Sequence, residues 1–146
     1  MAINTSKVVV GGLAAGVVAN VLGFLLFGLW LGPKFTAEFA AASPALAEKA
    51  AAAGAVPQIV SSFVVGLLLV WLYAAMRPRF GPGPKTAIYA ALVAWVLGFV
   101  FHMDLWTLGL TSPGTYMLAT VAALIQLIGA AWVGAMLYKE EGAPAM

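Results

Sequence analysis

The sequence predicts an all-α, polytopic membrane protein: a four-transmembrane-helix bundle with a short extra helix in its first outer loop. Of its 146 residues, 64% are hydrophobic and only 8% are charged, whereas a soluble domain is typically about 25% charged. The chain also contains four apolar stretches of about 20 residues, the length needed to cross roughly 30 Å of hydrocarbon. We therefore expect a single transmembrane domain over residues 1–146.

The predicted spans cover residues 8–31, 57–76, 86–108 and 116–138. The first span could also be a signal peptide, because Lys7 precedes its apolar run. That run is longer than the roughly 7–15 residues of a signal-peptide core and three more spans follow it, which favours a retained helix.

The connections differ in kind. In the first outer loop, Ser43 and Pro44 are typical of a helix start and Gly54 of a helix end, which predicts a short surface helix over residues 44–53. Between the second and third spans, residues 77–85 contain three prolines and two glycines, so we expect a tight hairpin without helix. Residues 111–114 are expected to form a brief turn.

Basic residues set the expected orientation. Five of them fall on one side of the alternating spans and two on the other: Lys7, Arg77, Arg79, Lys85 and Lys139 against Lys34 and Lys49. We expect a multi-pass protein of the bacterial inner membrane, and the positive-inside rule places both of its termini in the cytoplasm. We expect Arg77, Arg79 and Lys85 to face anionic lipid headgroups. The aromatic belts are expected to hold Trp30 and Trp106 outside, and Tyr73, Tyr89 and Tyr138 inside.

Two amides, Asn20 and Gln126, lie level with each other near the middle of the membrane, each on a stripe of small residues. Such stripes let helices approach closely, and amides form hydrogen bonds between helices. We expect packing surfaces on which the two amides bond to each other or across an oligomer interface. The alternative is that both line a substrate path at the midplane.

His102 and Asp104 lie near the outer end of the third span and, two residues apart, point to different faces of a helix. Ser61 and Ser62, with Gln58, lie at a similar level and could form a polar cluster with one of them. The functional alternatives are a proton-coupled site, a metal or haem ligand together with Met103, and a pH-sensing gate. Otherwise Asp104 reaches the headgroups and His102 hydrogen-bonds to the second span.

The functions open to this chain are limited by what it lacks. There is no cysteine, no clustered basic face for nucleic acid and no motif of a phosphate cradle, nucleophile elbow or zinc hydrolase. We expect neither an enzyme nor a cofactor. The favoured hypothesis is a protein that acts through helix association in the lipid bilayer, as a homo-oligomeric scaffold or as the accessory subunit of a membrane-protein partner. The alternative is a small oligomeric transporter or channel with a polar path through Asn20, Gln126, His102 and Asp104.

Two stretches carry a resemblance. Residues 28–35 close the first span with a tryptophan, a glycine-proline pair and an aromatic residue, and residues 71–89 form the central hairpin. In both, the chain resembles small uncharacterised four-span integral membrane proteins of bacteria. That resemblance implies the topology and no functional residue.

Overall fold

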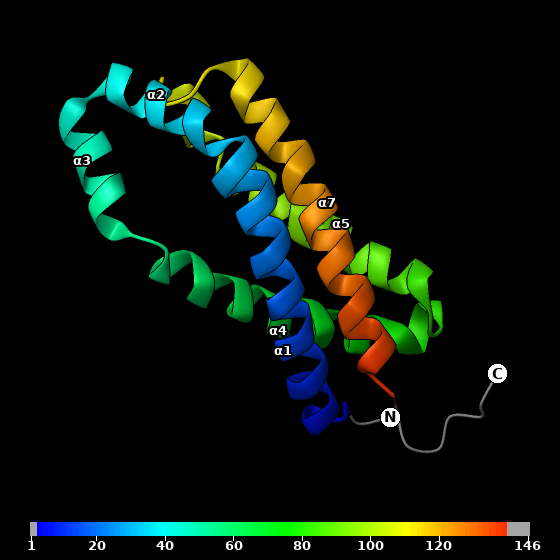
Figure 1. Cartoon of the computed structure of the whole chain (residues 1–146). Coiled ribbons are helices and arrows are strands. Elements are labelled where there is room, and N and C mark those ends of the chain that lie inside the picture. Colours follow the sequence, from blue (N-terminus) through cyan, green and yellow to red (C-terminus); the bar gives the residue numbers. More distant parts are fainter. Residues whose placement is uncertain (1–2, 140–146) are drawn as a thin grey trace.

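The computed structural model describes residues 3–139, which form helices and connections without any strand in that range (Figure 1). Four helical segments are long and apolar enough to cross a membrane: Thr5–Trp30, Val56–Phe80, Pro84–Thr107 and Pro113–Leu137. The predicted all-α, four-span fold is therefore confirmed. The start of α1 and the end of α7 lie at the same end of the molecule as the α4–α5 turn, which we call the inner end.

The first span changes from an α-helix to a π-helix towards its outer end. It begins as α1 (Thr5–Gly23), where the side chain of Asn4 accepts a hydrogen bond from the Lys7 N–H. It continues as a π-helix, η1 (Phe24–Trp30), and the Leu31 N–H still reaches back five residues to the Leu26 carbonyl oxygen. A π-helix in a membrane span often marks a functional site.

Two helices follow the first span, where the sequence predicted one. The predicted helix over residues 44–53 is confirmed as α3 (Pro44–Ala53), with the Ser43 side chain as its N-cap and Gly54 at a φ of 63° after it. The helix before it, α2 (Gly32–Ala42), was not predicted. The signal was present, because Pro33 stands in the first turn of α2 just as Pro44 stands in that of α3.

The second span, α4 (Val56–Phe80), extends further than predicted. The expectation that proline excludes helix from residue 77 onward is wrong, because Pro78 lies inside the last turn of α4. Proline has a helical φ and gives up only its own N–H bond, so a helix tolerates it near its end better than in its middle. The turn shrinks to residues around Gly81 and Gly83, whose φ values of 82° and 121° suit glycine.

The third span is broken near its outer end. It consists of α5 (Pro84–Phe101), a bend at His102 and Met103, and one turn of helix, α6 (Asp104–Thr107). The last span, α7 (Pro113–Leu137), begins at Ser112, whose side chain accepts from the Thr115 N–H. The expected turn over residues 111–114 thus passes directly into α7.

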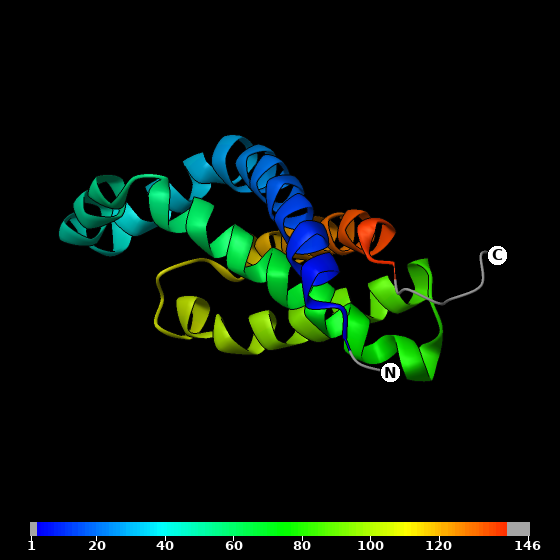
Figure 2. The same ribbon diagram turned by 90° about the horizontal axis from the view of Figure 1, so that it is seen from below.

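Glycines let α1 pack main chain against main chain on α4 and α7 (Figure 2). A Cβ atom on Gly66 of α4 would lie 2.5 Å from both the Gly12 carbonyl oxygen and the Gly16 nitrogen of α1. On the other side, a Cβ atom on Gly11 would lie 2.7 Å from the Gly134 carbonyl oxygen of α7. No larger residue fits these contacts unless the helices move apart. We call the contact of Gly66 with Gly12 and Gly16 the glycine crossing.

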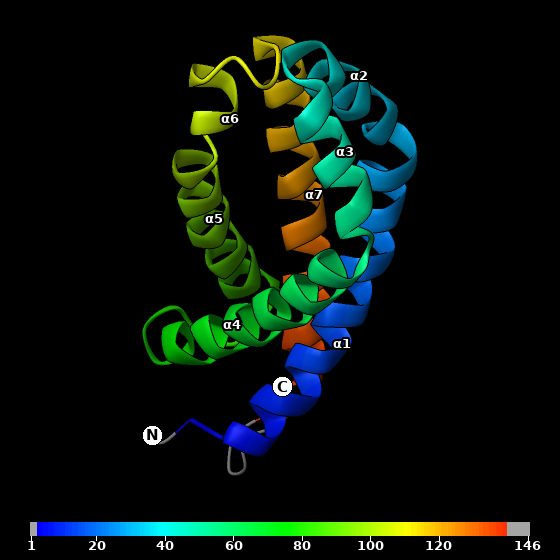
Figure 3. The same cartoon turned by 90° about the vertical axis from the view of Figure 1, so that its left-hand side faces the viewer.

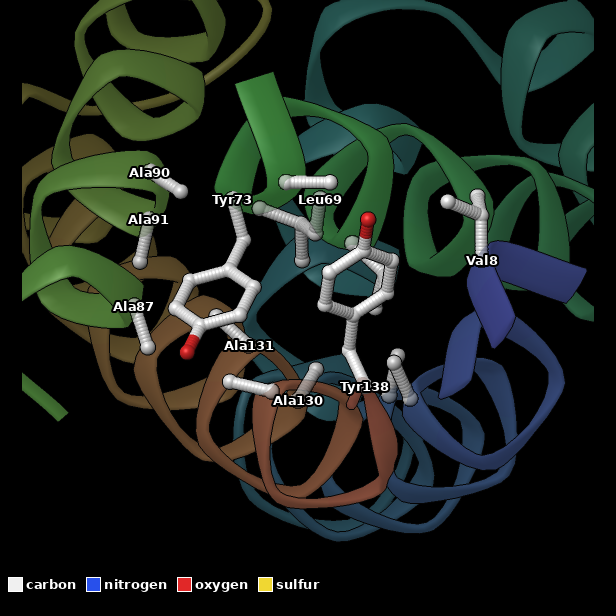
Figure 4. Close-up of a cluster of buried hydrophobic side chains, with 14 residues drawn as sticks. Val8, Leu69, Tyr73, Ala87, Ala90, Ala91, Ala130, Ala131 and Tyr138 are labelled. Atoms are coloured by element: carbon white, nitrogen blue, oxygen red, sulfur yellow. The ribbon is translucent and has the colours of Figure 1, made fainter. Parts of the chain in front are cut away.

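Buried aromatic side chains fill the inner end (Figure 4). The rings of Tyr73 and Tyr138 meet edge to face with centroids 6.0 Å apart, and the Arg77 guanidinium lies 5.4 Å from the Tyr138 centroid. The Tyr138 hydroxyl accepts from the Asn4 N–H, which ties the end of α7 to the start of the described chain. Small side chains of α5 and α7 surround this pair: Ala87, Ala90, Ala91, Ala130 and Ala131.

These contacts correct two expectations. Tyr73 and Tyr138 are each 3% exposed, so they are core residues and do not form an inner aromatic belt. Arg77 is half-buried on their rings, whereas Arg79 and Lys85 are exposed where lipid headgroups can reach them. The outer tryptophans, Trp30 and Trp106, are exposed as a belt requires.

The glycine crossing predicts that an added methyl group destabilises the protein at Gly66 but not at Gly98. Gly66→Ala is expected to lower the free energy of unfolding by about 1–3 kcal/mol, because the added carbon overpacks the α1–α4 contact. Gly98→Ala is the matched control, since nothing lies within 4 Å of its added Cβ and alanine favours helix by about 1 kcal/mol or less. Thermal unfolding in detergent measures both. Equal stability of the two variants would contradict the close approach.

Candidate functional site

A cavity of about 470 Å³ lies between the helices in the outer half of the molecule. It is bounded by residues of all four spans and of α2, and the glycine crossing lies on its inner side. α4 and α5 contribute opposite sides because they diverge from their shared turn (Figure 3). The cavity has a polar wall, an aromatic wall and a floor.

The polar wall consists of Gln58, Ser61 and Ser62 at the start of α4. His102, at the end of α5, lines the cavity from the opposite side, three residues after Phe99. Both serine hydroxyls donate to the Gln58 carbonyl oxygen, Ser61 over 3.0 Å and Ser62 over 2.9 Å. The residues of the predicted polar cluster therefore line one cavity, from two sides of it.

The expectation that His102 hydrogen-bonds to the second span is wrong. The His102 Nδ1 lies 2.8 Å from the Gly98 carbonyl oxygen within its own helix. Because a carbonyl oxygen only accepts, Nδ1 carries the proton in this contact. Asp104 is exposed, and Leu105 takes the adjacent place in the cavity wall.

The aromatic wall is fixed by hydrogen bonds between α5 and α7. The Trp95 Nε1–H donates to the Thr120 carbonyl oxygen over 2.8 Å, and the Tyr116 hydroxyl donates to the Phe99 carbonyl oxygen over 2.5 Å. The Phe99 ring lies between the other two, with centroids 6.2 Å from Trp95 and 5.6 Å from Tyr116. Phe27 of η1 and Phe35 of α2 extend this wall outward.

Gln126 of α7 forms the floor together with Ala19 of α1. The Gln126 Nε2 donates to the Ala19 carbonyl oxygen over 2.7 Å. Asn20 points elsewhere: its Nδ2 donates to the Gly16 carbonyl oxygen over 2.9 Å and to the Ile59 carbonyl oxygen of α4 over 3.4 Å. The two amides therefore do not bond to each other, and each connects helices of one chain.

Four of the six predicted intramembrane candidates line this one cavity: Ser61, Ser62, His102 and Gln126. Asn20 and Asp104 are absent from its wall. The aromatic wall was not predicted, although Trp95, Phe99 and His102 follow one another at spacings of four and three residues, which places them on one face of a helix.

The small-residue stripes include Gly12 and Gly16 on the first span and Ala119, Ala123 and Gly134 on the last, and they face other parts of the same chain. Gly12 and Gly16 face Gly66, Gly134 faces Gly11, and Ala119 and Ala123 line the cavity. The close approach that such residues allow is therefore accounted for by contacts between α1, α4 and α7.

A clasp at the outer end holds α2, and with it Phe35, against α7. Glu38 of α2 accepts hydrogen bonds from the Ser112 N–H over 3.0 Å and from the Ser112 and Thr115 hydroxyls over 2.7 Å each. Burial works to raise the pKa of Glu38, but these hydrogen bonds and the nearby charge of Lys34 outweigh it and hold the pKa below its usual value. No sequence signal marked Glu38, because α2 was expected to be loop.

Within residues 3–139, no group of three or more histidine, aspartate or glutamate side chains lies close enough to hold a metal ion. The lone imidazole of the chain, His102, already uses Nδ1 within its helix. The cavity is therefore best described by its hydrogen-bonding and apolar surfaces.

The chain matches no protein-family model, no curated protein and no solved structure.

Gln126→Leu tests the cavity floor. Removing the bond to the Ala19 carbonyl is expected to lower the free energy of unfolding by roughly 0.6–2 kcal/mol, the usual range for a hydrogen bond between membrane helices. Gln58→Leu is the matched control, because the Gln58 side chain forms no interhelical hydrogen bond among the described residues. Unfolding in mixed micelles measures both. If the two variants lost the same stability, the Gln126 bond would not hold the floor together.

The Glu38 clasp predicts a pH dependence. Because its folded-state pKa lies below the usual carboxyl value of 4.5, the clasp stabilises α2 fully above that value and loses strength as the pH falls through the lowered pKa. Hydrogen exchange in α2 should therefore quicken below about pH 4.5 beyond its intrinsic rate change. Glu38→Gln should exchange faster at neutral pH and lack this step, whereas Glu48→Gln on α3 should retain it. A step that survives in Glu38→Gln would assign the effect to another group.

Proposed function

We propose that this multi-pass membrane protein is not an enzyme but binds a small amphipathic molecule from the bilayer in its outer cavity. The observation that carries the proposal is a polar wall facing an aromatic wall at membrane depth. Ligand sites are typically apolar cavities of roughly 300–1,000 Å³ with a few placed polar groups. Polar groups inside a membrane are costly unless they pair or serve a site, and these are gathered around a cavity.

The same contacts bear on the expected role in helix association. An accessory subunit or a self-assembling scaffold was favoured because small-residue stripes offered surfaces for partners. The glycines Gly12, Gly16 and Gly134 of those stripes are occupied by the glycine crossing and by the Gly11–Gly134 contact. Packing within the chain therefore explains the feature that most favoured a homo-oligomer or a protein partner. The binding of a small molecule becomes the stronger proposal.

The expected path of a transporter or channel is also incomplete. Only His102 and Gln126 of its four residues line the cavity. On the inner side, buried side chains such as Leu69, Val70 and Tyr73 fill the space between the helices. This arrangement supports a site that is reached from the outer half of the bilayer, and residues 3–139 offer no continuous polar path.

The proposed orientation places the inner end in the cytoplasm, within a bacterial inner membrane. The start of α1, the α4–α5 turn and the end of α7 share that end, and they carry Lys7, Arg79, Lys85 and Lys139. The opposite end carries Lys34 and Lys49. This distribution agrees with the positive-inside rule.

Filling the cavity tests the proposal. The probe is 4-octylphenol with a diazirine in its alkyl chain, crosslinked by light in liposomes. Adducts are expected on Trp95 and Tyr116, and excess 4-octylphenol should suppress them. Ala123→Phe should reduce these adducts at least about tenfold by occupying the cavity. Ala75→Phe on the exposed face of α4 is the matched control and should leave them unchanged. Adducts confined to lipid-facing residues, or equal in both variants, would overturn the proposal.

A further inference from the structure

The cavity wall has an unusual division of hydrogen-bonding roles. Most of its side-chain donors are already bound to a main-chain carbonyl. This holds for the hydroxyls of Ser61, Ser62, Tyr116 and Thr120, for the ring N–H groups of Trp95 and His102, and for one amide N–H of Gln126. What these side chains retain for a ligand is their accepting atoms.

His102 is the clearest case. With the Nδ1 proton engaged by Gly98, the neutral ring presents Nε2 as a lone-pair acceptor. Among the described residues, Nε2 has no protein partner. Ser62 adds a second acceptor, because it lines the cavity and its hydroxyl proton points to the Gln58 main-chain carbonyl. The carbonyl oxygen of the Gln126 side chain is a third.

The lack of charged residues in the cavity wall limits which head groups can bind there. The residues of the wall include no lysine, arginine, aspartate or glutamate. A carboxylate or phosphate would therefore enter without a countercharge, and the burial of an unpaired ion is strongly unfavourable. An uncharged head group on an apolar body suits this wall.

Building on the proposed function, we propose that the cavity selects an uncharged ligand whose head group is a hydroxyl, that is, an alcohol or a phenol. A hydroxyl donates its proton to an acceptor such as His102 Nε2. Its oxygen can accept from the Gln58 amide, whose N–H groups are the main uncommitted donors of the wall. An ether or a ketone can only accept, so it leaves the histidine acceptor unpaired.

Matched competitors test the choice of head group. 4-Octylphenol and its methyl ether, 4-octylanisole, compete with the diazirine probe for the Trp95 and Tyr116 adducts. The two compounds enter lipid to different extents, so their potencies cannot be compared directly. The informative quantity is the potency of the phenol relative to the ether in the native protein, divided by the same ratio in His102→Phe. The lipid contribution cancels in that quotient, since the bilayer is the same. Phenylalanine keeps a ring in the wall and removes the acceptor.

The quotient is expected to be about tenfold in favour of the phenol, the size of one hydrogen bond of roughly 1.4 kcal/mol. Val96→Phe, on the exposed face of α5, should give the native ratio. Thermal unfolding shows whether His102→Phe is folded, and Gln58→Leu should reduce the phenol preference less than His102→Phe does. Competition by both compounds with a quotient near one would overturn the hydroxyl assignment and leave the binding site standing. Competition by neither compound would remove the proposed function itself.

Discussion

The rest of the structure depends on the approach of two main chains at the glycine crossing. Gly66 faces Gly12 and Gly16 so closely that no side chain fits between α1 and α4. Lipid offers helices no hydrophobic gain for associating, so such main-chain proximity is a principal source of packing energy in a membrane. With α7 placed equally close at Gly11 and Gly134, α1 fixes the positions of both neighbours.

Because these contacts lie on the inner side of the cavity, the outer half need not close. Tyr73, Tyr138 and the surrounding alanines fill the inner end, whereas the first residues of α4 and the last residues of α5 face each other across the cavity. In the outer half, hydrogen bonds fix the positions of the helices around the cavity. Gln126 bonds to α1, Tyr116 and Trp95 join α5 to α7, and Glu38 binds the start of α7. A rigid inner end and a tied outer end together preserve a cavity.

The sequence was most informative where one residue type decides the structure locally. Apolar length predicted the spans, and the Ser43–Pro44 pair and Gly54 predicted α3 to the residue. It was least informative where partners are distant in the chain. Nothing near Glu38 indicates that Ser112 would bind it, and Tyr73 and Tyr138 read as belt residues because each stands near a span end. Pro78 misled because proline's cost depends on its position in a helix, which composition does not give.

The same limit applies to the site. The depths of Ser61, Ser62, His102 and Gln126 could be estimated from helical rise, and these four do share a cavity. Which way each proton points depends on carbonyls that only the folded chain positions, such as those of Gly98 and Ala19. The acceptor character of the wall is therefore a property of the fold.

The most direct test of this account is the divergence of α4 and α5. Since the chain has no cysteine, spin labels can be attached in pairs without removing a native residue. Dipolar distances in nanodiscs would compare an outer pair, Val60 with Val100, and an inner pair, Ala75 with Lys85, all at exposed positions. The account predicts that the outer distance clearly exceeds the inner one in the native protein. An outer distance equal to or shorter than the inner one would mean that the helices close over the cavity, and would contradict the account.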